Sequence, residues 1–120
     1  MGHITGELNI TPTSNKRKWK TTSEISYVTD SGQTILVPSG FVMDGASIPR
    51  SLWFAVGHPL MGNFARAAAI HDYLYTTHEV SKAEADQIFL DIMIIDKVKP
   101  WRRIAMYYAV KFFGGPAYKS

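Results

Sequence analysis

The sequence predicts a small α+β domain, in which an N-terminal antiparallel β-sheet is followed by three to four packed helices. Up to residue 43, apolar residues alternate in short runs that turn residues separate. From residue 63 onward, apolar residues recur every three or four positions, as on one face of a helix. Because strands come first and helices second, an α+β architecture is favoured over alternating units.

Length and composition indicate one folded unit with one core. The 120 residues suit a single domain over residues 1–120, and 46% apolar with 19% charged residues is typical of a folded chain. The chain has no cysteine, which excludes disulfides, thiolate metal sites and cysteine nucleophiles. The longest apolar runs fall far short of the roughly 20 residues that cross a bilayer. We therefore expect no transmembrane segment.

The N-terminal part is expected to form short strands. Residues 4–10 predict a first strand that ends at the turn cluster 11–15. Residues 23–29 and 33–37 predict a hairpin around the turn 30–32. On one face of this hairpin we expect Ile25, Tyr27, Thr29, Ile35 and Val37.

A basic run, Lys16 to Lys20, precedes the hairpin and encloses one tryptophan. Such a run can contact phosphate or stack on a base, but it is also typical of a solvated strand edge that lysines protect from aggregation. The formal charge of +3 is small for a nucleic-acid binder. We expect no specific nucleic-acid partner and treat binding through this run as an alternative.

A short strand at residues 41–43 leads into a turn with possible chemistry. Gly45 permits backbone angles closed to other residues, so amides near Gly45 and Ser47 could hold an anion or oxyanion. The Asp44 carboxylate and turn carbonyls could instead hold a hard cation. A plain strand-to-helix turn explains the same residues.

Four helical segments follow, at residues 50–56, 63–76, 81–98 and 100–113. Ser81 and Glu84 form a capping box at the start of the third. The second is expected to bury Phe64, Ala67, Ala68, His71, Leu74 and Tyr75. The third is expected to bury Asp86, Phe89, Leu90, Met93 and Ile94. The last is expected to bury Trp101, Ile104, Ala105, Tyr108, Ala109 and Phe112, with Arg102, Arg103 and Lys111 in water.

The short connection at residues 77–80 predicts that the second and third helices are antiparallel neighbours. His71 and Asp86 each lie five residues from this connection, which is roughly 7.5 Å along either helix. They should therefore lie side by side, where a carboxylate orients an imidazole that acts as a general base. Tyr75, one turn after His71, could also hydrogen-bond Asp86.

Asp72 is assigned a second role in this hypothesis. With Asp44 or carbonyls of the Gly45 turn, it could bind Ca²⁺, which would polarise a substrate oxygen. Two alternatives remain open. His71, Asp86 and Tyr75 could be a buried polar cluster that only fixes the helix pair, or Ser47 could be a nucleophile with His71 as its base.

Two resemblances extend this interpretation. The motifs GFVMDGASIP (Gly40 to Pro49), HDYLY (His71 to Tyr75), Ala85-Asp86 and PWRR (Pro100 to Arg103) resemble a small phage and prophage family catalogued as a domain of unknown function. This resemblance implies a phage source, and hence a virion part or a protein that acts on the host envelope.

The pattern His71-Asp72-x-x-Tyr75 with a later Asp86 is similar to the helix pair of secreted phospholipases A2. That resemblance implies that His71 is the base, that Asp72 binds calcium, and that Asp86 and Tyr75 orient the histidine.

Together these observations lead to the hypothesis of a phage-encoded, virion- or tail-associated hydrolase with a phospholipase-A2-like site. Host envelope lipid or peptidoglycan would be its substrate, other virion proteins or copies of itself its partners, and the virion, or the host cytoplasm before assembly, its location. The alternative is a purely structural tail, neck or baseplate component.

Overall fold

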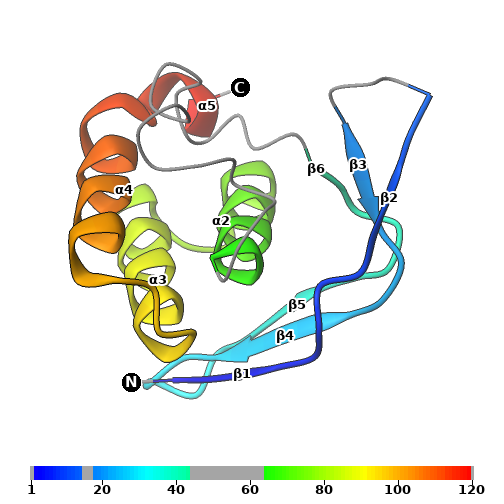
Figure 1. Ribbon diagram of the computed structural model, residues 1–120, viewed down its shortest axis with the longest axis horizontal. Helices are drawn as coiled ribbons and strands as arrows, with labels where there is room; N and C mark the ends of the chain where they lie inside the picture. Colours follow the sequence, from blue (N-terminus) through cyan, green and yellow to red (C-terminus); the bar gives the residue numbers. More distant parts are fainter. Residues whose placement is uncertain (1, 15–17, 44–63, 120) are drawn as a thin grey trace.

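The structure, a computed structural model, describes residues 2–14, 18–43 and 64–119. In these ranges six strands precede four helices, which confirms the α+β prediction (Figure 1). The strands are β1 (His3–Thr5), β2 (Ile10–Pro12), β3 (Trp19–Thr21), β4 (Ile25–Val28), β5 (Thr34–Val37) and β6 (Val42–Met43). The helices are α2 (Ala65–Thr77), α3 (Lys82–Ile95), α4 (Pro100–Phe113) and α5 (Gly115–Lys119).

The predicted hairpin is present as β4 and β5. The two strands pair antiparallel, with Ile25 opposite Val37 and Tyr27 opposite Ile35. All four side chains are buried, because the alternation places them on the one face that meets the helices. With β1 on the other side of β4, the hairpin forms a three-stranded sheet in the order β1-β4-β5.

The N-terminal strands differ from the prediction in two respects. Residues 4–10 do not form one strand, because Gly6 takes a left-handed backbone (φ 98°) between β1 and β2. The two pieces join different sheets, since β2 belongs to a second sheet in the order β2-β3-β6. The strand that contains Lys20 is also not an edge: β3 lies between β2 and β6.

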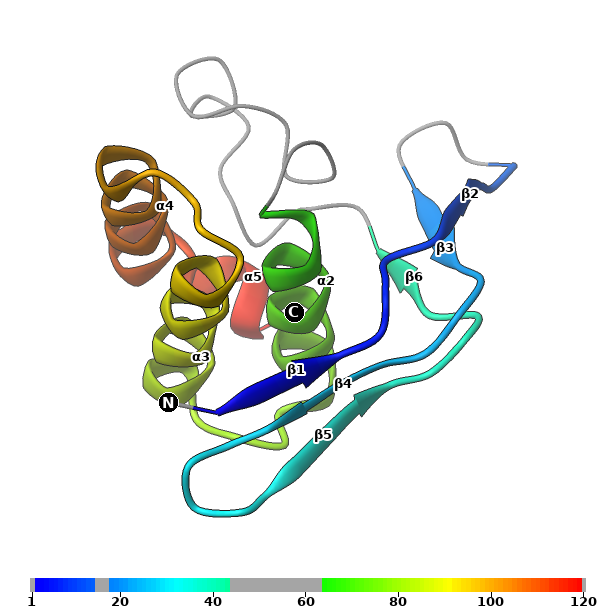
Figure 2. The same cartoon turned by 60° about the horizontal axis from the view of Figure 1, so that its bottom comes forward.

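Helices α2, α3 and α4 pack side by side, and α2 contacts the strands. α2 packs on β5 and β6 and against α3, while α3 lies between α2 and α4 (Figures 1 and 2). The predicted stripe of α2 is confirmed, with Phe64, Ala67, Ala68, His71, Leu74 and Tyr75 all buried. In the described ranges, no helix is long and apolar enough to cross a membrane.

Helix α3 begins as predicted and ends earlier. The Ser81 hydroxyl accepts a hydrogen bond from the Glu84 amide at 3.2 Å, which confirms its capping role. The Glu84 carboxylate accepts from that same hydroxyl at 3.4 Å. The helix ends at Ile95 and not at Val98, because Lys97 adopts a left-handed conformation (φ 61°) that turns the chain toward α4.

The orientation predicted for α4 is wrong, although its bounds are as expected. Its buried side chains are Met106, Ala109 and Val110, whereas Trp101, Ile104, Ala105, Tyr108 and Phe112 are exposed. Apolar residues occupy two stripes of this helix, and the stripe with Met106 is the one that contacts the core. Arg102 and Arg103 are half-buried, and Lys111 is exposed. After Gly114 the chain continues into α5, which the prediction did not include.

The helical segment predicted at 50–56 and the turn at Asp44, Gly45 and Ser47 lie outside the described residues.

The two stripes of α4 predict different costs of truncation. Met106→Ala should lower the free energy of unfolding by about 2–5 kcal/mol, because it opens a cavity at a fully buried position. Ile104→Ala, on the exposed stripe of the same helix, should change it by no more than about 0.5 kcal/mol. Urea denaturation of both variants measures the difference. Equal costs for the two changes would contradict the orientation of α4.

Candidate functional site

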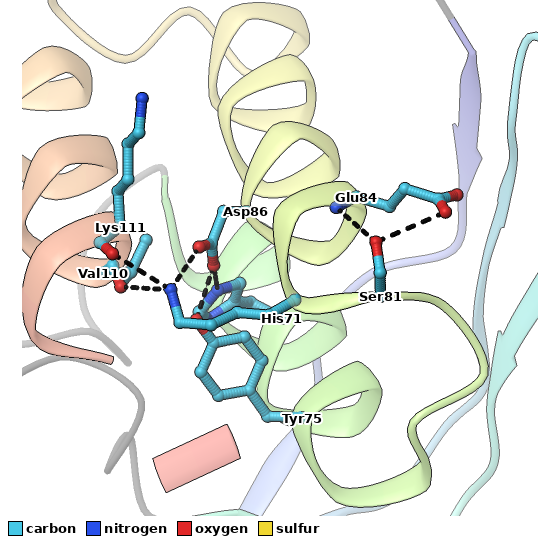
Figure 3. Close-up of polar contacts among 8 residues, drawn as sticks. His71, Tyr75, Ser81, Glu84, Asp86, Val110 and Lys111 are labelled. Carbon is cyan, nitrogen blue, oxygen red and sulfur yellow. Dashed lines mark hydrogen bonds and ion pairs between the residues drawn. The ribbon is translucent and has the colours of Figure 1, made fainter. Parts of the chain in front are cut away.

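The candidate site lies where α2 and α3 face each other beside their short connection (Figure 3). α2 ends at Thr77, and the next residue, His78, caps it: its left-handed backbone (φ 57°) lets its amide donate to the Leu74 carbonyl at 2.9 Å. Ser81 then starts α3. This tight reversal brings the inward faces of the two helices together and sets His71 opposite Asp86, as the sequence predicted.

The Asp86 carboxylate joins the two predicted partners. His71 Nε2 lies 2.7 Å from Asp86 Oδ1, and the Tyr75 hydroxyl donates to the same oxygen at 2.5 Å. Because an ionised carboxylate only accepts, Nε2 carries the hydrogen. The His71 side chain is 0% exposed and Asp86 2% exposed, so these bonds are shielded from water. The juxtaposition of His71, Tyr75 and Asp86 is therefore confirmed.

A third partner of Asp86, the cationic Lys82, was not identified from the sequence. Its ammonium donates to Asp86 Oδ2 at 2.7 Å and to the Val110 and Lys111 carbonyls at 2.9 and 3.2 Å (Figure 3). The two carbonyls belong to the last turn of α4, and the Val110 carbonyl also accepts from the Gly114 amide at 2.9 Å. Lys82 thus connects the carboxylate to the end of a third helix.

The sequence could have predicted the contact of Lys82 with Asp86 but not its contacts with α4. Lys82 and Asp86 are four residues apart on one helix, a spacing at which side chains meet. The carbonyls of α4 are 28 and 29 residues away, and no local pattern connects them to Lys82.

The hydrogen bonds determine the charge state of Asp86. Burial alone would raise its pKa, but the bonds from His71, Lys82 and Tyr75 together hold the pKa of this carboxyl below its ordinary value. Asp86 is thus ionised at neutral pH. The pKa of Tyr75 is raised, first by burial and then by its hydrogen bond to the negative Asp86, so Tyr75 stays protonated as a donor.

The other ring nitrogen of His71 has no such partner. Nδ1 is buried and, within the described ranges, makes no hydrogen bond. The ring is held from the side by Phe89, which stacks on it at 4.6 Å between centroids, and by Tyr75 at 4.1 Å. An unsatisfied buried polar atom costs about 1–3 kcal/mol, and such atoms in native proteins call for a reason.

The remaining predicted site residues are only partly placed. Asp72 is buried on α2, next to His71, and its negative charge adds to the rise in the Tyr75 pKa. Asp44, Gly45 and Ser47 lie outside the described residues. Over the described ranges, no three His, Cys, Asp or Glu side chains gather into a metal site. No step below runs through calcium.

Replacement of Asp86 should reveal its contribution to stability. Asp86→Asn keeps the shape but removes the charge that His71 and Lys82 face, so we expect a loss of about 2–3 kcal/mol at pH 7. Because the folded pKa is lowered, this contribution is complete above the unfolded pKa of 3.8 and is lost progressively as pH falls from there through the lowered folded pKa. Urea denaturation should therefore show a smaller difference from the wild type at pH 3 than at pH 7. A difference that did not change with pH would contradict an ionised Asp86.

Gly114, after α4, offers a test of how tightly Tyr75 is held. A Cβ at Gly114 would lie 2.5 Å from the Val110 carbonyl oxygen and 2.8 Å from the Tyr75 hydroxyl. Gly114→Ala should therefore cost about 1–3 kcal/mol and displace Tyr75 from Asp86. Gly115→Ala meets nothing within 4 Å and is the matched control. Thermal unfolding compares the two, and equal melting temperatures would rule out this close contact.

The family described as Protein of unknown function (DUF1353) matches residues 19–110. The chain is also 35% identical over 92 residues to the uncharacterized protein y4jT of Sinorhizobium fredii, and 37% identical over 71 residues to the uncharacterized protein y4iH of the same bacterium. These matches cover 77% and 59% of this chain.

The chain spans less than a third of either relative, since the matches cover 27% of y4jT and 30% of y4iH. No solved structure gives a significant match. The family match reaches from β3 to the last turn of α4, so it includes His71, Tyr75, Lys82 and Asp86. The chain therefore belongs to the DUF1353 family.

Proposed function

We propose that this chain is a hydrolase module in which His71 Nδ1 is the general base and Asp86 orients it. One observation carries the proposal: a buried ring nitrogen without a hydrogen-bond partner among the described residues, on a histidine whose other nitrogen a carboxylate holds. A nitrogen in this position has a lone pair to offer to a water or a hydroxyl group.

The proton can be followed through the site. With hydrogen on Nε2, Nδ1 removes a proton from a water molecule, whose oxygen attacks the carbonyl carbon of an ester. The ring then carries a positive charge, which Asp86 stabilises at 2.7 Å. Nδ1 later returns the proton to the leaving oxygen. Tyr75 and Lys82 keep Asp86 in place throughout and touch no substrate in this scheme.

Access is the requirement that this mechanism adds. The His71 ring has no exposed surface, so a substrate reaches Nδ1 only after a group that covers the ring moves. The hydrogen bond between the His71 ring on α2 and Asp86 on α3 need not break during this movement. Activity should therefore depend on conditions that open the site, such as contact with the substrate surface.

The resemblance to secreted phospholipases A2 supports an ester of host envelope lipid as the substrate, with peptidoglycan as the second choice. The resemblance to phage and prophage proteins supports a virion or tail protein, present in the host cytoplasm before assembly. Ca²⁺ bound by Asp72 and Asp44 belongs to the same proposal. Hydrolysis with added Ca²⁺ and with chelator, for wild type and Asp72→Asn, tests that part separately.

Complete burial of His71 favours a second candidate, a structural virion component of a tail, neck or baseplate. In that case, the hydrogen bonds of Asp86 fix α2, α3 and α4 to one another, and His71 has no chemical role. The two candidates differ in what His71 is needed for: the hydrolase needs its basic nitrogen for hydrolysis, whereas the structural component does not.

His71→Gln separates the two candidates. Glutamine keeps an amide donor for Asp86 but has no basic nitrogen, so we expect hydrolysis to fall roughly 10²–10⁴-fold while the protein stays folded. Release of fatty acid from phospholipid vesicles and of muropeptides from peptidoglycan measures activity, and circular dichroism measures folding. Tyr75→Phe, which loses one bond to Asp86, should retain part of the activity.

Full activity of folded His71→Gln would exclude His71 as the base. If the wild type hydrolyses neither substrate, and if virions with His71→Gln assemble and infect normally, the hydrolase proposal is wrong.

A further inference from the structure

Helix α4 presents an apolar stripe to solvent on the outer side of the molecule. Trp101, Ile104, Tyr108 and Phe112 follow one another at intervals of three or four residues, and Phe113 extends the stripe at its end. Trp101 is 56% exposed and Phe112 67%. α4 packs on α3 and α5, on the side of α3 that faces away from α2, so its outer face points away from the molecule (Figures 1 and 2). A contiguous apolar surface of this kind indicates a binding face.

The charged side chains in the segment that carries this stripe are all positive. Residues 97–120 contain six of the 13 lysines and arginines and none of the 10 aspartates and glutamates. The preceding 96 residues therefore have a net charge of −3, although the whole chain is at +3. The positive charge of the protein is concentrated in the segment that carries the stripe.

Cations lie directly beside the aromatic rings at both ends of the stripe. The Arg102 guanidinium lies 5.4 Å from the centre of the Trp101 ring. The Lys111 ammonium lies 5.7 Å from the Tyr108 ring and 5.9 Å from the Phe112 ring. Helices that lie in the plane of a membrane surface combine these features: a Trp- and Phe-rich face and flanking lysines and arginines.

We propose that the outer face of α4 docks on a lipid bilayer with anionic headgroups. The helix, about 20 Å long, would lie along the surface with its stripe among the acyl chains and its cations at the phosphates. A second copy of the chain fits this face poorly, because two such faces would bring the like charges of Arg102 and Lys111 on both copies together, with no Asp or Glu on α4 to offset them. The proposal does not depend on a catalytic role for His71.

The test is co-sedimentation of the purified chain with vesicles. The chain should bind vesicles that contain phosphatidylglycerol, bind pure phosphatidylcholine much more weakly, and dissociate as salt is raised. Ile104→Ser with Phe112→Ser should weaken binding at least roughly tenfold. Leu36→Ser with Val42→Ser is the matched control, since these residues are exposed to a similar degree (43% and 46%) but lie on the two sheets.

A second pair of variants tests the charges. Lys99→Gln with Lys111→Gln should weaken binding to anionic vesicles roughly tenfold or more, whereas Lys18→Gln with Lys20→Gln, which removes two exposed lysines in and beside β3, should have little effect. Circular dichroism checks that all variants fold. Vesicle binding is measured without hydrolysis, so a failure of the proposed hydrolase function would not change the result of this test.

Three results would overturn the proposal: equal binding to both kinds of vesicle, equal weakening by the control variants, or no vesicle binding. In the last case, sedimentation velocity of the wild type and of Ile104→Ser with Phe112→Ser would show whether the face joins two copies instead.

Discussion

The carboxylate of Asp86 is the group on which the arrangement of the helices depends. It accepts from His71 and Tyr75 on α2, and from Lys82, which also binds the last carbonyls of α4. A buried negative charge is tolerated only when donors surround it, and here α2 and α3 provide them. The same bonds that fix α2, α3 and α4 also fix the tautomer of His71.

The packing of the helices and the proposed role of His71 as a base therefore both depend on the Asp86 side chain. In a purely structural cluster, each buried polar atom finds a partner, and Oδ1 and Oδ2 of Asp86 both do. His71 Nδ1 differs, because the described residues offer it no partner. This contrast within one cluster is the observation on which the proposal of His71 as a general base rests.

Helix α4 shows where local patterns reach their limit. Its sequence has apolar residues on both sides, with Trp101, Ile104 and Tyr108 on one stripe and Met106 and Val110 on the other. Spacing alone cannot choose between two such stripes. The choice follows from contacts: Lys82 holds the end of α4 to α3, and this fixes which stripe is covered. The side left outside becomes the basic, aromatic face proposed to bind lipid.

The sequence by itself determined what depends on near neighbours. These features are the hairpin with Ile25 and Tyr27 inward, the helix cap at Ser81, and the contact of His71 with Asp86. The last follows because the short connection between α2 and α3 places the two residues at the same level. Only the tertiary structure decided the division of the first strand at Gly6, the contacts of Lys82 and the orientation of α4. These depend on groups far apart in the chain, whose distances no spacing pattern contains.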